Sequence, residues 1–211
     1  IIAAFPAVPA LTMALWRNAI GTAVMAVPAA ATNPRSFGRL GRREWGWSAV
    51  AAVALALHFV CFMISVRMTT VAAATALVCL QAVWIALFQT LRGIRYGWQV
   101  GLGILLSFAG VVVITGFDIG SGREALIGDV LAVIGGVLAA AYTMAGSKAR
   151  ATMGTSTYTT LCYGMTSIIL LVIIGRDLGT ALVLCAILLA MLWVVGAPAR
   201  LFTIALSVIG A

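Results

Sequence analysis

Seven long runs without a charged residue constrain this chain more than any other feature of its sequence. A helix needs about 20 residues to cross the hydrocarbon core of a bilayer, and the runs are close to that length. Polar and apolar residues do not alternate along them as they would in a membrane β-barrel. We therefore predict an all-α, polytopic membrane helix bundle. The runs are Asn18–Pro34 (extended upstream through Pro9), Trp45–Val66, Met68–Leu91, Tyr96–Phe117, Val130–Ser147, Ala151–Gly175 and Leu178–Ala199.

The composition excludes the classes of protein that work in water. Only 9% of the 211 residues are charged and 64% are hydrophobic, whereas a soluble domain carries about 25% charged residues. The net charge of +8 comes from basic residues scattered between the apolar runs, as in the loops of a membrane protein. We therefore expect the lipid bilayer as a partner and no nucleic acid. The four cysteines form no CxxC pair and have no partnering histidine at metal-ligand spacing, so we expect no metal site and no cofactor.

The two ends of the sequence are shorter than membrane spans. The chain begins at Ile1, and its last apolar run, Leu201–Ala211, has only eleven residues. We therefore expect an incomplete bundle, with about seven full spans and two partial ends.

Basic residues in the loops predict the orientation. Arg35, Arg39, Arg42 and Arg43 share one loop, and summing alternate loops gives nine basic residues on their side against three on the other. Cytoplasmic loops carry the excess of Lys and Arg. The sequence thus predicts a multi-pass protein of the plasma (inner) membrane, with the Arg35–Arg43 loop in the cytoplasm.

Four segments resemble one transporter family. They read PALTMALWRNAIG (Pro9–Gly21), ALHFVCFMISVRMTTVAAATALVCLQAVWIALF (Ala56–Phe88), WQVGLGILLSFAGVVVITG (Trp98–Gly116) and GDVLAVIGGVLAAAYTMAGSKAR (Gly128–Arg150). In order and spacing the region resembles the EamA-like branch of the drug/metabolite transporter superfamily. The resemblance implies a ten-helix fold of two inverted five-helix repeats. Residues 1–119 would be the first repeat, with its first helix mostly missing. Residues 127–211 would be an incomplete second repeat that diverges after about residue 175. The family often has a proline in its fourth helix, where this chain has Gln81 and Ala82.

Polar residues inside spans are the candidates for a substrate path, because such groups are costly in lipid and usually face the bundle interior or a wet cavity. His58, the only histidine, is expected to contact substrate or bind a proton, or else to hydrogen-bond a neighbouring helix. Gln81, Trp84 and Phe88 share one helical face, which suits a small amphipathic ligand. Gln81 is also a residue type that joins helices by hydrogen bonds.

Three further candidates come from other spans. Arg17 either snorkels to the outer interface, the interpretation we favour from sequence, or binds an anionic group. Tyr142 lies on a stripe with small residues that leave it room, and Tyr163 lies on a broad polar face. Both tyrosines are candidates for lining a wet path.

Small residues four positions apart predict where the helices pack closely, since lipid tails give no hydrophobic reward for helix association. This spacing occurs at Ala72–Ala76, Gly103–Ser107 and Gly136–Ala140.

The predicted function is a secondary membrane transporter that exports small metabolites, amino acids or drugs by alternating access at a midplane cavity. No Walker A sequence is present, so the chain does not hydrolyse nucleotides by that motif. One alternative is a truncated or inactive remnant, or a half-size membrane subunit that needs a partner, for which a homodimer is one arrangement. An intramembrane enzyme is the remote alternative, because no nucleophile motif or acid pair is present, and we assign no catalytic residues.

Overall fold

The structure is a computed structural model that describes residues 10–32, 37, 40–116 and 122–174. This part of the chain contains seven α-helices and no strand, as expected for an all-α protein. The helices are α1 (Ala10–Thr32), α2 (Arg42–Met68), α3 (Val71–Cys79), α4 (Gln81–Leu91), α5 (Trp98–Gly116), α6 (Gly122–Arg150) and α7 (Thr155–Ile174).

Five segments of the described chain are long and apolar enough to cross a membrane, which makes this a multi-pass membrane protein. They are α2, α3 together with α4, α5, α6 and α7. Helix α1 has 23 residues, but it is not among the five. The predicted span Leu178–Ala199 and the run Leu201–Ala211 lie outside the described residues.

Charged residues do not mark the ends of the helices, although the uncharged runs predicted that they would. Helix α6 begins eight residues before the predicted Val130 and continues to Arg150, so its helical turns include Glu124 and Lys148. Helix α2 likewise begins at Arg42 rather than at Trp45. A helix that projects beyond the hydrocarbon core can carry charges in its terminal turns, which is why the uncharged run underestimates its length.

The predicted single span Met68–Leu91 is interrupted at Leu80. The N–H of Leu80 donates to the Leu77 carbonyl at 3.3 Å, a tighter three-residue turn, and the α-helix then resumes with Trp84 N–H bonded to the Leu80 carbonyl. No proline is responsible. The interruption places Gln81 at the first turn of α4.

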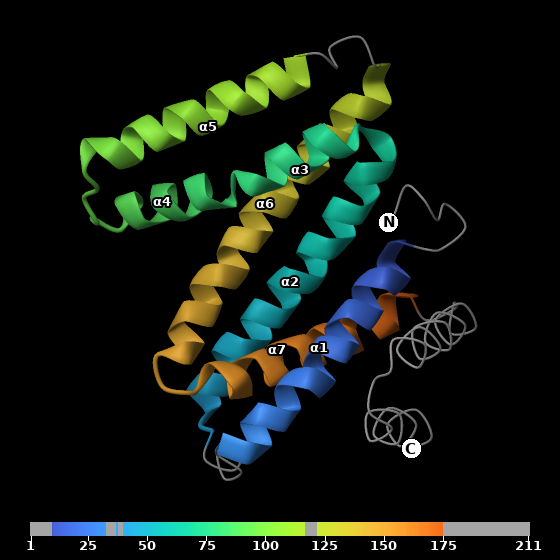
Figure 1. Ribbon diagram of the computed structural model, residues 1–211, viewed down its shortest axis with the longest axis vertical. Coiled ribbons are helices and arrows are strands. Elements are labelled where there is room, and N and C mark those ends of the chain that lie inside the picture. Colours follow the sequence, from blue (N-terminus) through green and yellow to red (C-terminus); the bar gives the residue numbers. More distant parts are fainter. Residues whose placement is uncertain (1–9, 33–36, 38–39, 117–121, 175–211) are drawn as a thin grey trace, which may run out of the picture.

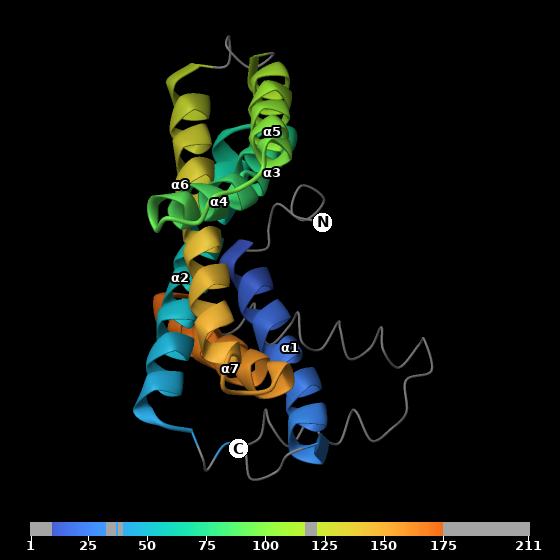
Figure 2. The ribbon, with the colours of Figure 1, turned by 90° about the vertical axis from the view of Figure 1, so that its left-hand side faces the viewer.

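The helices pack in two groups around a central antiparallel pair. Helices α2 and α6 run side by side in opposite directions (Figure 1). Helices α1 and α7 pack together against one end of this pair, while α3, α4 and α5 lie toward the other (Figures 1 and 2). One buried cluster joins α1, α2, α6 and α7, and a second joins α3, α4 and α6.

Small residues of α6 allow the close approach of α3, as the spacing at Gly136–Ala140 predicts. Gly136 and Ala140 are both buried, and a Cβ atom added to Gly136 would lie 3.2 Å from the Leu77 carbonyl oxygen. The same spacing at Gly103–Ser107 does not mark a close contact among the described residues. Both residues are exposed, and nothing described lies within 4 Å of a Cβ built on Gly103. Ala72 is also exposed.

Candidate functional site

A cavity of about 160 Å³ lies among α1, α2, α4, α6 and α7, and we call it the His58 cavity. It brings together five of the seven residues predicted to line a substrate path, although they are spread over 147 positions of sequence from Arg17 to Tyr163. The lining residues are Arg17, Asn18, Leu55, His58, Phe59, Gln81, Ala139, Tyr142 and Tyr163.

The ring of His58 is fixed by a hydrogen bond between helices. Its Nδ1 lies 2.9 Å from the carbonyl oxygen of Gly135 on α6. A carbonyl oxygen only accepts, so Nδ1 carries the hydrogen and donates it. In the neutral ring this leaves Nε2 as an acceptor. Phe62 stacks on the ring with centroids 6.0 Å apart. His58 therefore joins two helices, which is one of the roles considered from sequence, and it also lines the cavity.

Arg17 supplies the only charge among the described residues that line the His58 cavity. Its guanidinium carbon lies 5.4 Å from the centroid of the Phe59 ring, within range of a cation–π contact. The side chain thus lies against α2, next to the cavity. Asn18 beside it is only 2% exposed, and its Nδ2 donates to the Ala14 carbonyl at 2.7 Å. No carboxylate is among the lining residues.

The remaining polar groups reach the cavity from three helices. Gln81 comes from the start of α4, directly after the interruption at Leu80. The hydroxyl groups of Tyr142 on α6 and Tyr163 on α7 interact with each other. A Cβ atom on Gly21 would lie 2.8 Å from Cδ2 of Tyr163. The glycine therefore leaves the space on α1 that the Tyr163 ring occupies.

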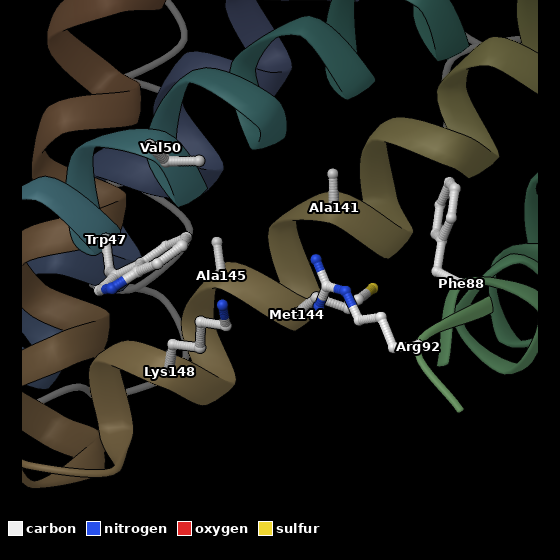
Figure 3. Close-up of a pocket in the computed structure, with 8 residues that line it drawn as sticks. All are labelled: Trp47, Val50, Phe88, Arg92, Ala141, Met144, Ala145 and Lys148. Carbon is white, nitrogen blue, oxygen red and sulfur yellow. The ribbon is translucent and has the colours of Figure 1, made fainter. Parts of the chain in front are cut away.

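Trp84 and Phe88 do not line the His58 cavity. Trp84 packs against the second buried cluster, next to Leu80 and Val83, and its Nε1 has no hydrogen-bond partner within the described chain. Phe88 lines another cavity, of about 270 Å³, shown in Figure 3. Phe88 lies seven residues after Gln81, which is about 10 Å along the helix. The same face of α4 therefore contributes Gln81 to the His58 cavity and Phe88 to the other cavity.

Sequence reasoning did not select four lining residues: Asn18, Leu55, Phe59 and Ala139. Asn18 carries the same signal as His58, a polar side chain inside an apolar run, and could have been found by it. The other three are apolar residues in apolar helices, and nothing in their local sequence distinguishes them from residues that face lipid.

Comparison with known proteins gives one match. The sequence model of the EamA-like transporter family matches residues 3–116, which is more than half of the chain and reaches the end of α5. Arg17, His58 and Gln81 lie within the matched region, and Tyr142 and Tyr163 lie beyond it. No curated protein and no solved structure matches the chain.

Proposed function

The chain belongs to the EamA-like transporter family, and from this premise we propose that it is a secondary transporter whose substrate binds in the His58 cavity. The observation that carries the proposal is the gathering of polar side chains from five helices around one cavity. Ionisable and amide groups are rare inside membrane spans and mark substrate paths when they converge. If these polar side chains served only to pack the helices together, we would expect no cavity among them.

The charge and size of the cavity support a small anionic or zwitterionic substrate. Arg17 offers a positive charge, and no lining carboxylate neutralises it, so an anionic group of the substrate would be its partner. The volume of about 160 Å³ corresponds to about five water molecules and is below the 300–1,000 Å³ of typical drug-sized pockets. Amino acids and other small metabolites fit this space better than drugs.

The hydrogen-bonding groups would orient such a substrate. Nε2 of His58 can accept a hydrogen bond, for example from an ammonium group. Gln81 and the two tyrosines provide both donors and acceptors. A zwitterion would therefore place its carboxylate toward Arg17 and its ammonium group toward His58.

The position of the cavity supports alternating access between two inverted repeats. Arg17, His58 and Gln81 belong to the proposed first repeat, residues 1–119. Tyr142 and Tyr163 belong to the proposed second repeat, residues 127–211. Substrate sites of inverted-repeat transporters lie between the repeats near the bilayer midplane, and rocking of one repeat against the other exposes them to each side. Export would then be driven by a gradient of an ion or of the substrate.

The distribution of basic residues supports the proposed orientation in the plasma membrane. Arg42 and Arg43 at the start of α2, Arg92 after α4 and Lys148 and Arg150 at the end of α6 all belong to the loops on the more basic side. Since positive loops stay in the cytoplasm, the Arg35–Arg43 loop would face the cell interior.

Removal of either neutral polar group from the cavity tests the proposal. We expect His58→Ala and Gln81→Ala each to lower transport about tenfold, because the bound substrate loses a hydrogen-bond partner in a site shielded from water. The measurement is counterflow of labelled small amino acids and carboxylates in proteoliposomes. Membrane insertion, measured by protease protection, should stay unchanged.

Thr75→Ala is the matched control for these variants. Thr75 is an exposed polar residue of α3 whose hydroxyl bonds the Val71 carbonyl of its own helix. Its variant should transport like the wild type. Normal counterflow by both cavity variants would remove His58 and Gln81 from the substrate path.

A further inference from the structure

The second cavity, lined by Phe88, combines an apolar wall with two cations, and we call it the Lys148 cavity. It lies among α2, α4 and α6 and has a volume of about 270 Å³. Figure 3 shows the side-chain nitrogens of Arg92 and Lys148 on the same side of α6, between Trp47 and Phe88. The lining residues are Trp47, Val50, Phe88, Arg92, Ala141, Met144, Ala145 and Lys148.

The charges in the Lys148 cavity are all of one sign. Arg92 caps the end of α4 and Lys148 lies in the last turn of α6, and no acidic residue is among the lining residues. The ammonium nitrogen of Lys148 lies 4.3 Å from the centroid of the Trp47 ring. Glu44, one helical turn before Trp47, accepts a hydrogen bond from Thr152 at 3.0 Å and does not line the cavity.

The helix dipoles explain why a cation is stable at each helix end, but not why two cations from different helices face one cavity. Like charges that line one cavity repel each other, and an anion placed between them would offset this repulsion. The structure thus offers a site for an anionic group.

The apolar wall of the Lys148 cavity favours a lipid over a soluble anion as its ligand. Val50 is 51% exposed, and Phe88 and Met144 are half-buried, so apolar surface continues from the two cations along the membrane helices. Trp47, Arg92 and Lys148 all lie near the ends of candidate spans, the level at which tryptophan and basic side chains meet lipid headgroups. A free phosphate would use the cations and leave this wall uncovered.

We propose that the Lys148 cavity binds an anionic phospholipid. Its phosphate lies between the guanidinium group of Arg92 and the ammonium group of Lys148, and the start of an acyl chain lies along Phe88, Val50 and Met144. Basic pockets between membrane helices are suited to this ligand class because charge attraction and apolar contact act together. This site does not depend on the identity of the transported substrate.

Native mass spectrometry of the full chain in detergent tests the site. The probes are phosphatidylglycerol, phosphatidylcholine with matched acyl chains, and inorganic phosphate. We expect one molecule of phosphatidylglycerol to bind at least tenfold more tightly than phosphatidylcholine. Arg92→Gln and Lys148→Gln should each weaken its binding about fivefold. Arg95→Gln, which removes an exposed cation of the same loop outside the cavity, should leave it unchanged.

Charge-retaining variants separate the role of charge from damage to the fold. Arg92→Lys and Lys148→Arg should bind phosphatidylglycerol nearly as well as the wild type. Equal loss in these variants and in the glutamine variants would contradict the proposal, since charge would then not be what holds the lipid.

Three other results would also overturn it. Equal binding of the two lipids would show that the anionic headgroup is not recognised. Displacement of phosphatidylglycerol by equimolar inorganic phosphate would identify a site for a soluble anion. An equal loss of phosphatidylglycerol binding in Arg95→Gln would show that the lipid is attracted to the basic surface as a whole and not to the Lys148 cavity.

Discussion

Arg17→Gln is expected to lower counterflow of a zwitterionic or anionic solute about 30-fold or more. Arg17 is the only charged group among the described residues of the His58 cavity, and its guanidinium lies over the Phe59 ring. Arg17 is exposed in the structure, so the expected loss is that of the charge-assisted contact with a bound anionic group, about 2 kcal/mol. The measurement is the initial rate of counterflow in proteoliposomes, normalised to the amount of inserted protein.

Two variants serve as controls for Arg17→Gln. Arg17→Lys keeps the charge but not the planar geometry of the guanidinium, so it should retain a measurable part of the activity. Arg123→Gln removes an exposed arginine at the start of α6, away from the cavity, and should transport normally. If Arg17→Gln transports as well as Arg123→Gln, the positive charge of Arg17 has no part in substrate binding.

Gly128→Leu is expected to cause the largest loss of stability, about 3 kcal/mol in the free energy of unfolding. A Cβ atom at Gly128 would lie 2.9 Å from Cβ of Met68 and 3.0 Å from the backbone nitrogen of Thr69. Neither atom is the end of a flexible side chain, so α6 would have to move away from the end of α2. Reversible unfolding with sodium dodecyl sulfate in mixed micelles measures the change.

Gly101→Leu is the matched control for this packing contact. Gly101 lies on α5, where nothing described comes within 4 Å of an added Cβ atom. Its substitution should change the free energy of unfolding by no more than about 0.5 kcal/mol. Equal stability of the Gly128 and Gly101 variants would contradict the close contact between α2 and α6.

The sequence predicted the helices well because the bilayer sets their length. The apolar runs correspond to α2, the α3–α4 segment, α5, α6 and α7, all of which are apolar enough to span. The interruption at Leu80 was not predicted, since no proline or glycine marks it and the turn depends on local hydrogen bonding beside the backbone of α6. The exposure of Gly103 was also missed. Small-residue spacing shows where a helix can approach closely, but it does not identify a partner.

The candidate site could be predicted in part because polar groups are costly in membrane helices. That rule selected Arg17, His58 and Gln81, which the structure brings to one cavity. The sequence did not show that Phe88 lies outside the His58 cavity. Residues on one face of α4 extend over a greater length than this cavity does. The hydrogen bond from His58 to Gly135 could not be predicted either, since it joins residues 77 positions apart through a backbone oxygen.

The charge selectivity of counterflow in proteoliposomes tests the central claim most directly. Three labelled pools of solutes with similar size would be compared in the wild-type protein: zwitterionic amino acids, small carboxylates and small amines. A substrate held by Arg17 in the His58 cavity predicts accumulation from the zwitterionic or carboxylate pool and none from the amines. Accumulation of the amines at an equal rate would contradict binding at that charge.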